Sequence, residues 1–191
     1  AEYGIRRARF AAINLKDEDE LVGMVQVDPD DKDDIVLITQ TSMALRFKLD
    51  TVSCTGRATA GVRGIDVAKN DAVRWFEIPK AGTMLFVVSD RGFGKRMLCD
   101  DIERQGRAGK GQKLLPMNKS GETGQMLAAC LNVTEAKAVR VEQKHGHVTT
   151  LDVSEISVQR RTAKGELLVN VLLDDVVEYA ALAGDMQEKT E

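Results

Sequence analysis

The chain has 191 residues, of which 43% are apolar and 30% charged, and its formal net charge is −3. This length allows one or two domains with a buried core. The near-neutral charge gives no global sign of a nucleic-acid partner, and an aromatic content of 4% argues against binding by base stacking. No apolar run approaches the roughly 18 residues of a membrane span, and we expect no signal peptide. Because the sequence opens on Ala1 without an initiator methionine, we expect a fragment of a longer polypeptide.

An internal repeat organises the chain. Four arginines stand 50, 50 and 54 residues apart, at Arg7, Arg57, Arg107 and Arg161. Glycine and small residues surround three of them in similar order, over 56–61, 106–111 and 160–165. The copy at 6–11 lacks the glycines. A fixed spacing of this kind is the mark of a repeat architecture.

Short apolar segments follow each copy in the same sequence. A first segment covers 13–15, 65–67, 114–117 and 167–172, and a second begins at 21, 73, 126 and 176. In the three complete repeats a third covers 35–39, 85–89 and 139–142, and a fourth covers 44–49, 94–98 and 147–153. These segments are rich in Val, Ile and Leu and are broken by Gly, Asp and Asn, which is typical of strands and turns.

Four short strands in every 50 or so residues are typical of propeller blades. We therefore predict an all-β fold with about four blades of four antiparallel strands, arranged as an open arc. The predicted repeats cover 5–54, 55–104, 105–158 and 159–183. The acidic tail over 184–191 is predicted to be disordered.

Motifs for enzymatic or metal chemistry are weak. Cys54, Cys99 and Cys130 form no CxxC pair, so we expect three reduced, mostly buried thiols. His145 and His147 lie on a predicted hairpin and could share a face. They have no third ligand at a defined spacing, which favours ordinary turn histidines over a metal site.

Charge is strongly segregated along the chain. Residues 17–34 hold nine acids and one Lys, whereas residues 91–119 hold eight Lys or Arg and three acids. The acidic run at 28–34 lacks EF-hand spacing, which favours a solvated loop over a cation site. The glycine-rich stretch at 91–96 lacks the strand-to-helix context of a phosphate-binding loop, which favours a hairpin turn.

Basic residues recur at equivalent points of the repeat. Equivalent residues of successive blades lie on one rim, so a recurring set of Arg and Lys predicts a surface for a curved polyanion. The glycines beside each Arg are expected to let a DNA backbone approach closely. The predicted DNA-contacting residues are Arg46, Arg57, Arg63, Arg91, Lys95, Arg96, Arg107, Lys110, Lys113, Arg160, Arg161 and Lys164.

Four stretches together resemble the C-terminal domain of the DNA gyrase A protein (gyrase A), in the same order and spacing. They cover 17–23, 56–65, 92–96 and 105–111, and the resemblance extends from about residue 3 to 177. It implies a β-pinwheel, a propeller variant whose blades exchange strands, of which this chain would be the last part. It also implies that DNA is wrapped around the outer rim. The family's QRRGGKG box is matched only in part, by QGRAGKG at 105–111 and QRRTAKG at 159–165.

The resemblance also sets expectations for partners and chemistry. It implies double-stranded DNA, the rest of gyrase A, and gyrase B as partners, no membrane association, and a cytoplasmic, nucleoid-associated location. Neither Tyr3 nor Tyr179 matches the family's catalytic tyrosine motif, so the fragment is predicted to be non-catalytic and without cofactor. The holoenzyme would use ATP and magnesium to introduce negative supercoils. The alternatives are a propeller that binds other proteins and the equivalent part of topoisomerase IV.

Overall fold

The computed structural model describes residues 12–16, 18–28, 30, 33–56, 59–172 and 174–184. Its strands are β1 (Asp34–Thr39), β2 (Met43–Lys48), β3 (Val73–Glu77), β4 (Met84–Ser89), β5 (Phe93–Met97), β6 (Gln112–Lys113), β7 (Leu127–Val133), β8 (Ala138–Gln143), β9 (Val148–Asp152), β10 (Glu166–Leu167) and β11 (Val177–Leu182). Three short 3-10 turns, η1 (Leu49–Thr51), η2 (Cys99–Asp101) and η3 (Val153–Glu155), follow the hairpins. None of the helical turns in this part of the chain has the length and apolar character needed to cross a membrane.

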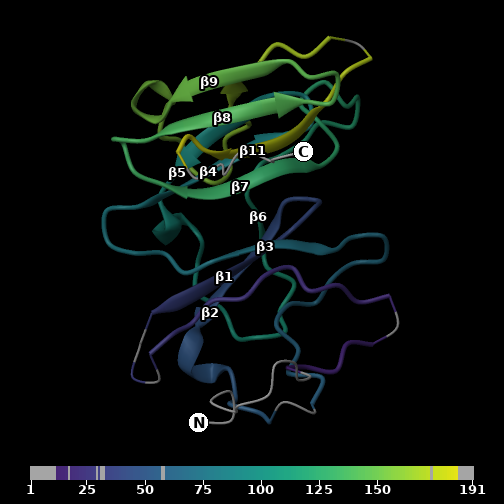
Figure 1. The fold of residues 1–191 in the computed structure, drawn as a ribbon, viewed down its shortest axis with the longest axis vertical. Coiled ribbons are helices and arrows are strands. Elements are labelled where there is room, and N and C mark those ends of the chain that lie inside the picture. The colour runs from purple at the N-terminus through teal and green to yellow at the C-terminus, as the bar shows by residue number, and fades with distance from the viewer. Residues whose placement is uncertain are drawn as a thin grey trace.

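Three antiparallel sheets are built on three β-hairpins, β1–β2, β4–β5 and β8–β9. The first sheet has the order β3-β1-β2-β6, the second β10-β5-β4-β7, and the third β11-β8-β9. In Figure 1 the strands β1, β2 and β3 occupy the lower half of the molecule, and the other two sheets occupy the upper half. The predicted all-β class with four-stranded antiparallel sheets is confirmed.

Each sheet is completed by strands that come later in the sequence. Strand β3 follows the first hairpin by one connection yet pairs with β1, and β6, which follows the second hairpin, pairs with β2. The second sheet repeats this pattern with β7 and β10. The third sheet receives β11 on the same side. The C-terminal half-repeat therefore donates its strands to the second and third sheets, and the described residues form three sheets where about four blades were predicted.

The predicted hairpin strands are confirmed to within about a residue, but the first predicted strand of each repeat is not. Residues 13–15 and 65–67 lie outside strands, and so do the described residues after 21 up to β1. Only the two-residue strands β6 and β10 form near the other two predicted positions. Leu114 and Leu115 are instead fully buried, so their apolar character reflects core packing after the chain has left the sheet edge. The predicted disordered tail lies outside the described residues from 185 onward.

The core lies between successive sheets. One cluster joins the first and second sheets and includes Val36, Val87 and Leu114. A second joins the second and third sheets and includes Phe86 and Val141. Val87 and its neighbour Phe86 serve different clusters because successive side chains of a strand point to opposite faces. The buried apolar faces thus stack the three sheets in chain order.

A half-buried carboxyl lies at the junction of the first two sheets. The side chain of Glu77 on β3 accepts a hydrogen bond of 2.9 Å from Nδ2 of Asn132 on β7. Burial raises the pKa of Glu77 to about 7, against a weaker lowering effect of that hydrogen bond. The folded protein therefore holds this proton at pH values where the unfolded chain has lost it.

This pKa predicts a pH-dependent stability. A folded-state pKa above the unfolded value of about 4.5 means that stability is fully present below pH 4.5 and is lost as pH rises through about 7. We expect Glu77→Gln to match the wild type at pH 4.5 and to exceed its free energy of unfolding by about 2 kcal/mol at pH 8. Urea unfolding of both proteins across this range is the measurement. A difference between them that stays constant with pH would refute the assignment.

Candidate nucleic-acid interface

The glycine–arginine pattern occurs three times, and its second and third copies continue into strands at the edges of the first and second sheets. We call residues 56–66, 106–116 and 160–170 basic segments 1, 2 and 3. Segment 2 contains β6, where Lys113 pairs with Met43 of the first sheet. Segment 3 contains β10, where Glu166 pairs with Gly94 of the second sheet. Each of these two segments therefore skips the hairpin directly before it in the chain and completes the sheet of the hairpin before that one.

Arginine side chains join each basic segment to the one before it. Nη1 of Arg107 in segment 2 donates to the backbone oxygen of Arg63 in segment 1 at 2.6 Å. Nη1 of Arg161 in segment 3 donates to the backbone oxygen of Lys113 in segment 2 at 2.9 Å. Because 63 and 113 are equivalent repeat positions, the same contact occurs twice. The three segments consequently lie side by side in chain order.

The exposed cations of this row come from all three segments. Lys110, Arg160 and Lys164 are exposed, and no hydrogen bond or ion pair engages their side chains in the described part of the chain. Arg63 is 64% exposed and pairs with Asp66 three residues on, an interaction that solvent weakens. Half-buried Lys113 is engaged, since its Nζ donates to Thr41 O at 2.7 Å. Four exposed cations therefore line the row formed by the basic segments.

Lys95 was predicted to contact DNA, but the structure places its side chain inside the protein. It is fully buried, and its Nζ donates to the backbone oxygens of Arg160, Arg161 and Ala163 at 2.7–2.8 Å. Burial and the nearby charge of Arg161 lower the pKa of Lys95 to about 8, so the ammonium form still predominates at neutral pH. Its three N–H donors match the three carbonyls, and Lys95 therefore holds basic segment 3 from beneath.

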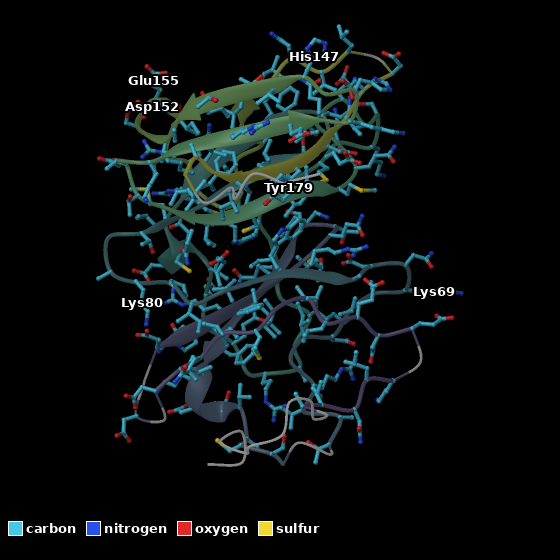
Figure 2. All side chains as sticks on the ribbon, in the orientation of Figure 1. Lys69, Lys80, His147, Asp152, Glu155 and Tyr179 are labelled. Carbon is cyan, nitrogen blue, oxygen red and sulfur yellow. The ribbon has the colours of Figure 1, made fainter. Side chains whose placement is uncertain are left out.

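Arg46 and Arg96 were also predicted to contact DNA, and they too serve the fold. They occupy equivalent positions, opposite Val36 and Phe86 in their hairpins. Arg46 donates to Cys99 O in η2 at 3.0 Å, and Arg96, only 5% exposed, donates to carbonyl oxygens beside and within η3 at 2.6 and 3.1 Å. Figure 2 shows Glu155 of η3 at the far end of β9 from His147. Each arginine thus fixes the 3-10 turn of the following repeat.

The other predicted contacts divide between engaged and undescribed residues. Arg91 is half-buried and donates to Asp175 O at 2.8 Å and Leu172 O at 3.3 Å, so it ties a hairpin turn to the chain before β11. Arg57 lies outside the described residues, as does Arg7 of the repeat.

The glycines of the basic segments serve strand exchange. Gly111 and Gly165 both have positive φ, of 75° and 79°. A Cβ on Gly111 would lie 2.4 Å from Ala44 O, and one on Gly165 would lie 2.6 Å from Gly94 O. These glycines are therefore required where the exchanged strand meets the hairpin, and the close approach of a DNA backbone stays a prediction.

The pairing of Arg104 with Asp34 was not predicted from the sequence. Burial acts to raise the pKa of the Asp34 carboxyl, but hydrogen bonds from Arg104 and Arg46 outweigh it and hold that pKa below its usual value. Those bonds reach Oδ2 of Asp34 at 2.8 and 2.7 Å. At the end of the predicted solvated acidic run, the buried carboxylate of Asp34 thus pairs with two arginines. The only signal in the sequence was the start of a strand at this position.

The cysteines and histidines carry no assembled site. Cys99 and Cys130 are buried and Cys54 is exposed, all three as free thiols. Nδ1 of His145 lies 3.6 Å from Oδ1 of buried Asp175, and His147 is exposed beside β9 (Figure 2). No cluster of three His, Cys, Asp or Glu side chains suited to a metal ion occurs among the residues that the structure describes.

Comparison with known families decides the relationship. The family model of the DNA gyrase C-terminal domain, a β-propeller, matches residues 11–28, 33–80, 83–123 and 150–183. This is more than half of the chain. The chain belongs to the family of DNA gyrase A C-terminal domains. The predicted family resemblance is confirmed.

Relatives with known names agree with this membership. The chain is 35% identical over 182 residues to the DNA gyrase A protein of Deinococcus deserti, which covers 92% of the chain and 22% of that protein. It is 31% identical over 172 residues to the DNA gyrase A protein of Salmonella typhimurium, covering 90% of the chain and 19% of that protein. The chain thus spans about a fifth of the length of these relatives.

Solved structures share the fold at lower sequence identity. The C-terminal domain of DNA topoisomerase IV superimposes with a TM-score of 0.86 at 21% identity, over 95% of this chain and 56% of that one. A DNA gyrase A C-terminal domain superimposes with a TM-score of 0.75 at 20% identity, over 90% of this chain and 57% of that one.

Proposed function

We propose that this chain binds duplex DNA through the row of basic segments, with little dependence on sequence, and bends it as a non-catalytic part of gyrase A. The observation that carries the proposal is the side-by-side placement of segments whose exposed cations are Arg63, Lys110, Arg160 and Lys164. Phosphates are recognised by charge and position rather than by base identity. Cations spaced along a curved row favour a bent duplex, because the additional phosphates that a bent duplex brings to the row offset the elastic cost of bending.

Salt dependence is the direct test of this proposal. Each phosphate contact adds about 0.9 to the slope of log K against log salt, so four exposed cations predict a slope of about −3.6. Affinity for a mixed-sequence duplex should then fall about 150-fold between 50 and 200 mM salt. Fluorescence anisotropy with two unrelated duplexes measures both the slope and the sequence tolerance. Equal affinities at the two salt concentrations would refute DNA binding through these cations.

The equivalent part of topoisomerase IV is the second candidate, favoured by the high TM-score of its C-terminal domain. Both candidates would bind DNA in the same way, so a binding assay does not separate them. Supercoiling of relaxed plasmid by the complete enzyme does. In the gyrase case the partners would be the rest of gyrase A, gyrase B and DNA, and ATP and magnesium would act elsewhere in the holoenzyme. A protein-binding propeller would instead bind a protein with no salt-dependent affinity for duplex DNA.

A further inference from the structure

The two junctions between basic segments are built differently. At the first junction, between segments 1 and 2, Asp66 N donates to Gly109 O at 2.8 Å and Ala108 N donates to Gly64 O at 2.6 Å. These backbone bonds accompany the side-chain bond of Arg107 to Arg63 O. Between the described residues of segments 1 and 2, the first junction therefore has three direct hydrogen bonds, two of which do not depend on a side chain.

At the second junction the backbone bonds are missing. Pro116 stands at the repeat position of Asp66, 50 residues on, and proline has no N–H to donate. The acceptor equivalent to Gly109 O is Ala163 O, 54 residues on, which Lys95 Nζ binds at 2.7 Å instead. Among the described residues, the bond from Arg161 to Lys113 O is the one direct hydrogen bond between segments 2 and 3.

The environment of Arg161 suits it to this contact better than to a phosphate. Its side chain is half-buried, and its Nε is buried without a hydrogen-bond partner. The flanking Arg160 and Lys164 are exposed. A guanidinium whose Nη1 is held by a backbone carbonyl at 2.9 Å is fixed in orientation, and its planar shape cannot be copied by an ammonium.

We propose that Arg161 is a positioning residue that sets the spacing between basic segments 2 and 3, and that it does not itself bind DNA. In this role it keeps the exposed cations Lys110 and Lys164 at a fixed separation. The inference rests on the proposed DNA-binding function. On this proposal the preference for curved DNA comes from a contact between two protein segments. Cations held at a fixed separation match only one path of the duplex.

Label distances test the spacing without DNA. Spin labels at Lys110→Cys and Lys164→Cys, in a Cys54→Ser background, report the separation of the two segments, because Cys99 and Cys130 are buried. We expect Arg161→Lys to broaden the distance distribution about twofold. Arg107→Lys, the matched control at the junction with two backbone bonds, should leave it unchanged. An Arg161→Lys distribution identical to that of the parent would overturn the proposal.

DNA affinity supplies the second readout. The preference for curved DNA is measured as the ratio of the affinities for a small circular duplex and for a linear duplex of the same sequence. We expect Arg161→Lys to lose about tenfold of the preference for the circle although the charge is kept, and Arg161→Gln to keep the salt slope of the wild type. A direct phosphate contact would instead leave Arg161→Lys near wild type and lower the slope for Arg161→Gln by about 0.9. That pair of results would overturn the proposal.

A rescue variant separates positioning from a loss of folding. Pro116→Ala restores a backbone N–H at the position where Asp66 donates in the first junction. Combined with Arg161→Lys, it should narrow the label distances again and recover the preference for the circle; no recovery in a folded double variant would count against the proposal. A wild type without salt-dependent binding would refute the proposed function, whereas the label distances would still decide whether Arg161 positions the segments.

Discussion

Replacing Lys95 by methionine is expected to lower the free energy of unfolding by about 3 kcal/mol. The methionine side chain can fill the space of the lysine stem but offers no N–H group. The backbone oxygens of Arg160, Arg161 and Ala163 would then lose their partner, and each lies within 2.8 Å of Nζ in the wild type. Urea unfolding followed by circular dichroism measures the loss. Hydrogen exchange should also become faster across basic segment 3.

The matched control is Leu45→Met, because Leu45 occupies in the first sheet the position of Lys95 in the second. Both side chains are fully buried, but leucine makes no polar contact, so this exchange should cost less than about 1.5 kcal/mol. Equal urea midpoints for the two variants would show that water satisfies the three carbonyls without Lys95. The interpretation of Lys95 as the support of basic segment 3 would then be wrong.

The repeat and the hairpins could be predicted from the sequence because they depend on local patterns. Short runs rich in Val, Ile and Leu between turn residues identified β4 and β8 to within one residue. The exchange of strands could not be predicted in this way. Strand β6 pairs with residues about 70 positions earlier in the chain, and a two-residue strand carries no period. The apolar run after it predicted a strand at 114–117, whereas Leu114 and Leu115 pack in the core.

The basic residues on the hairpin strands were predicted to contact DNA, whereas the structure engages their side chains within the fold. The reason is related. Recurrence in the repeat was interpreted as a shared surface for DNA, but a repeated structural need produces the same recurrence. Arg46 and Arg96 recur because each holds the 3-10 turn that follows the next hairpin. In the third sheet, where the described residues add no exchanged strand to β9, Thr150 stands at this position. The loss of arginine together with the loss of the exchanged strand supports the structural interpretation.

Exposure therefore separates the cations that hold the fold from those that can contact DNA. The second large effect is expected when the exposed cations are reversed in charge. Reversing the charge of three exposed residues, by Lys110→Glu, Arg160→Glu and Lys164→Glu, should weaken duplex binding about a thousandfold at 50 mM salt. These side chains make no contact that the described fold requires, so the unfolding midpoint should stay near that of the wild type. Anisotropy titration measures the affinity, and thermal unfolding checks the fold.

The matched control reverses three other exposed lysines, by Lys119→Glu, Lys137→Glu and Lys144→Glu. All three lie in turns or connections of the third repeat outside the basic segments, and their reversal changes the net charge by the same amount. If DNA binding depended on net charge alone, the two triple variants would lose affinity equally. A loss confined to Lys110, Arg160 and Lys164 would locate the DNA on the row of basic segments, because the positions of the charges would then be the only difference between the two proteins.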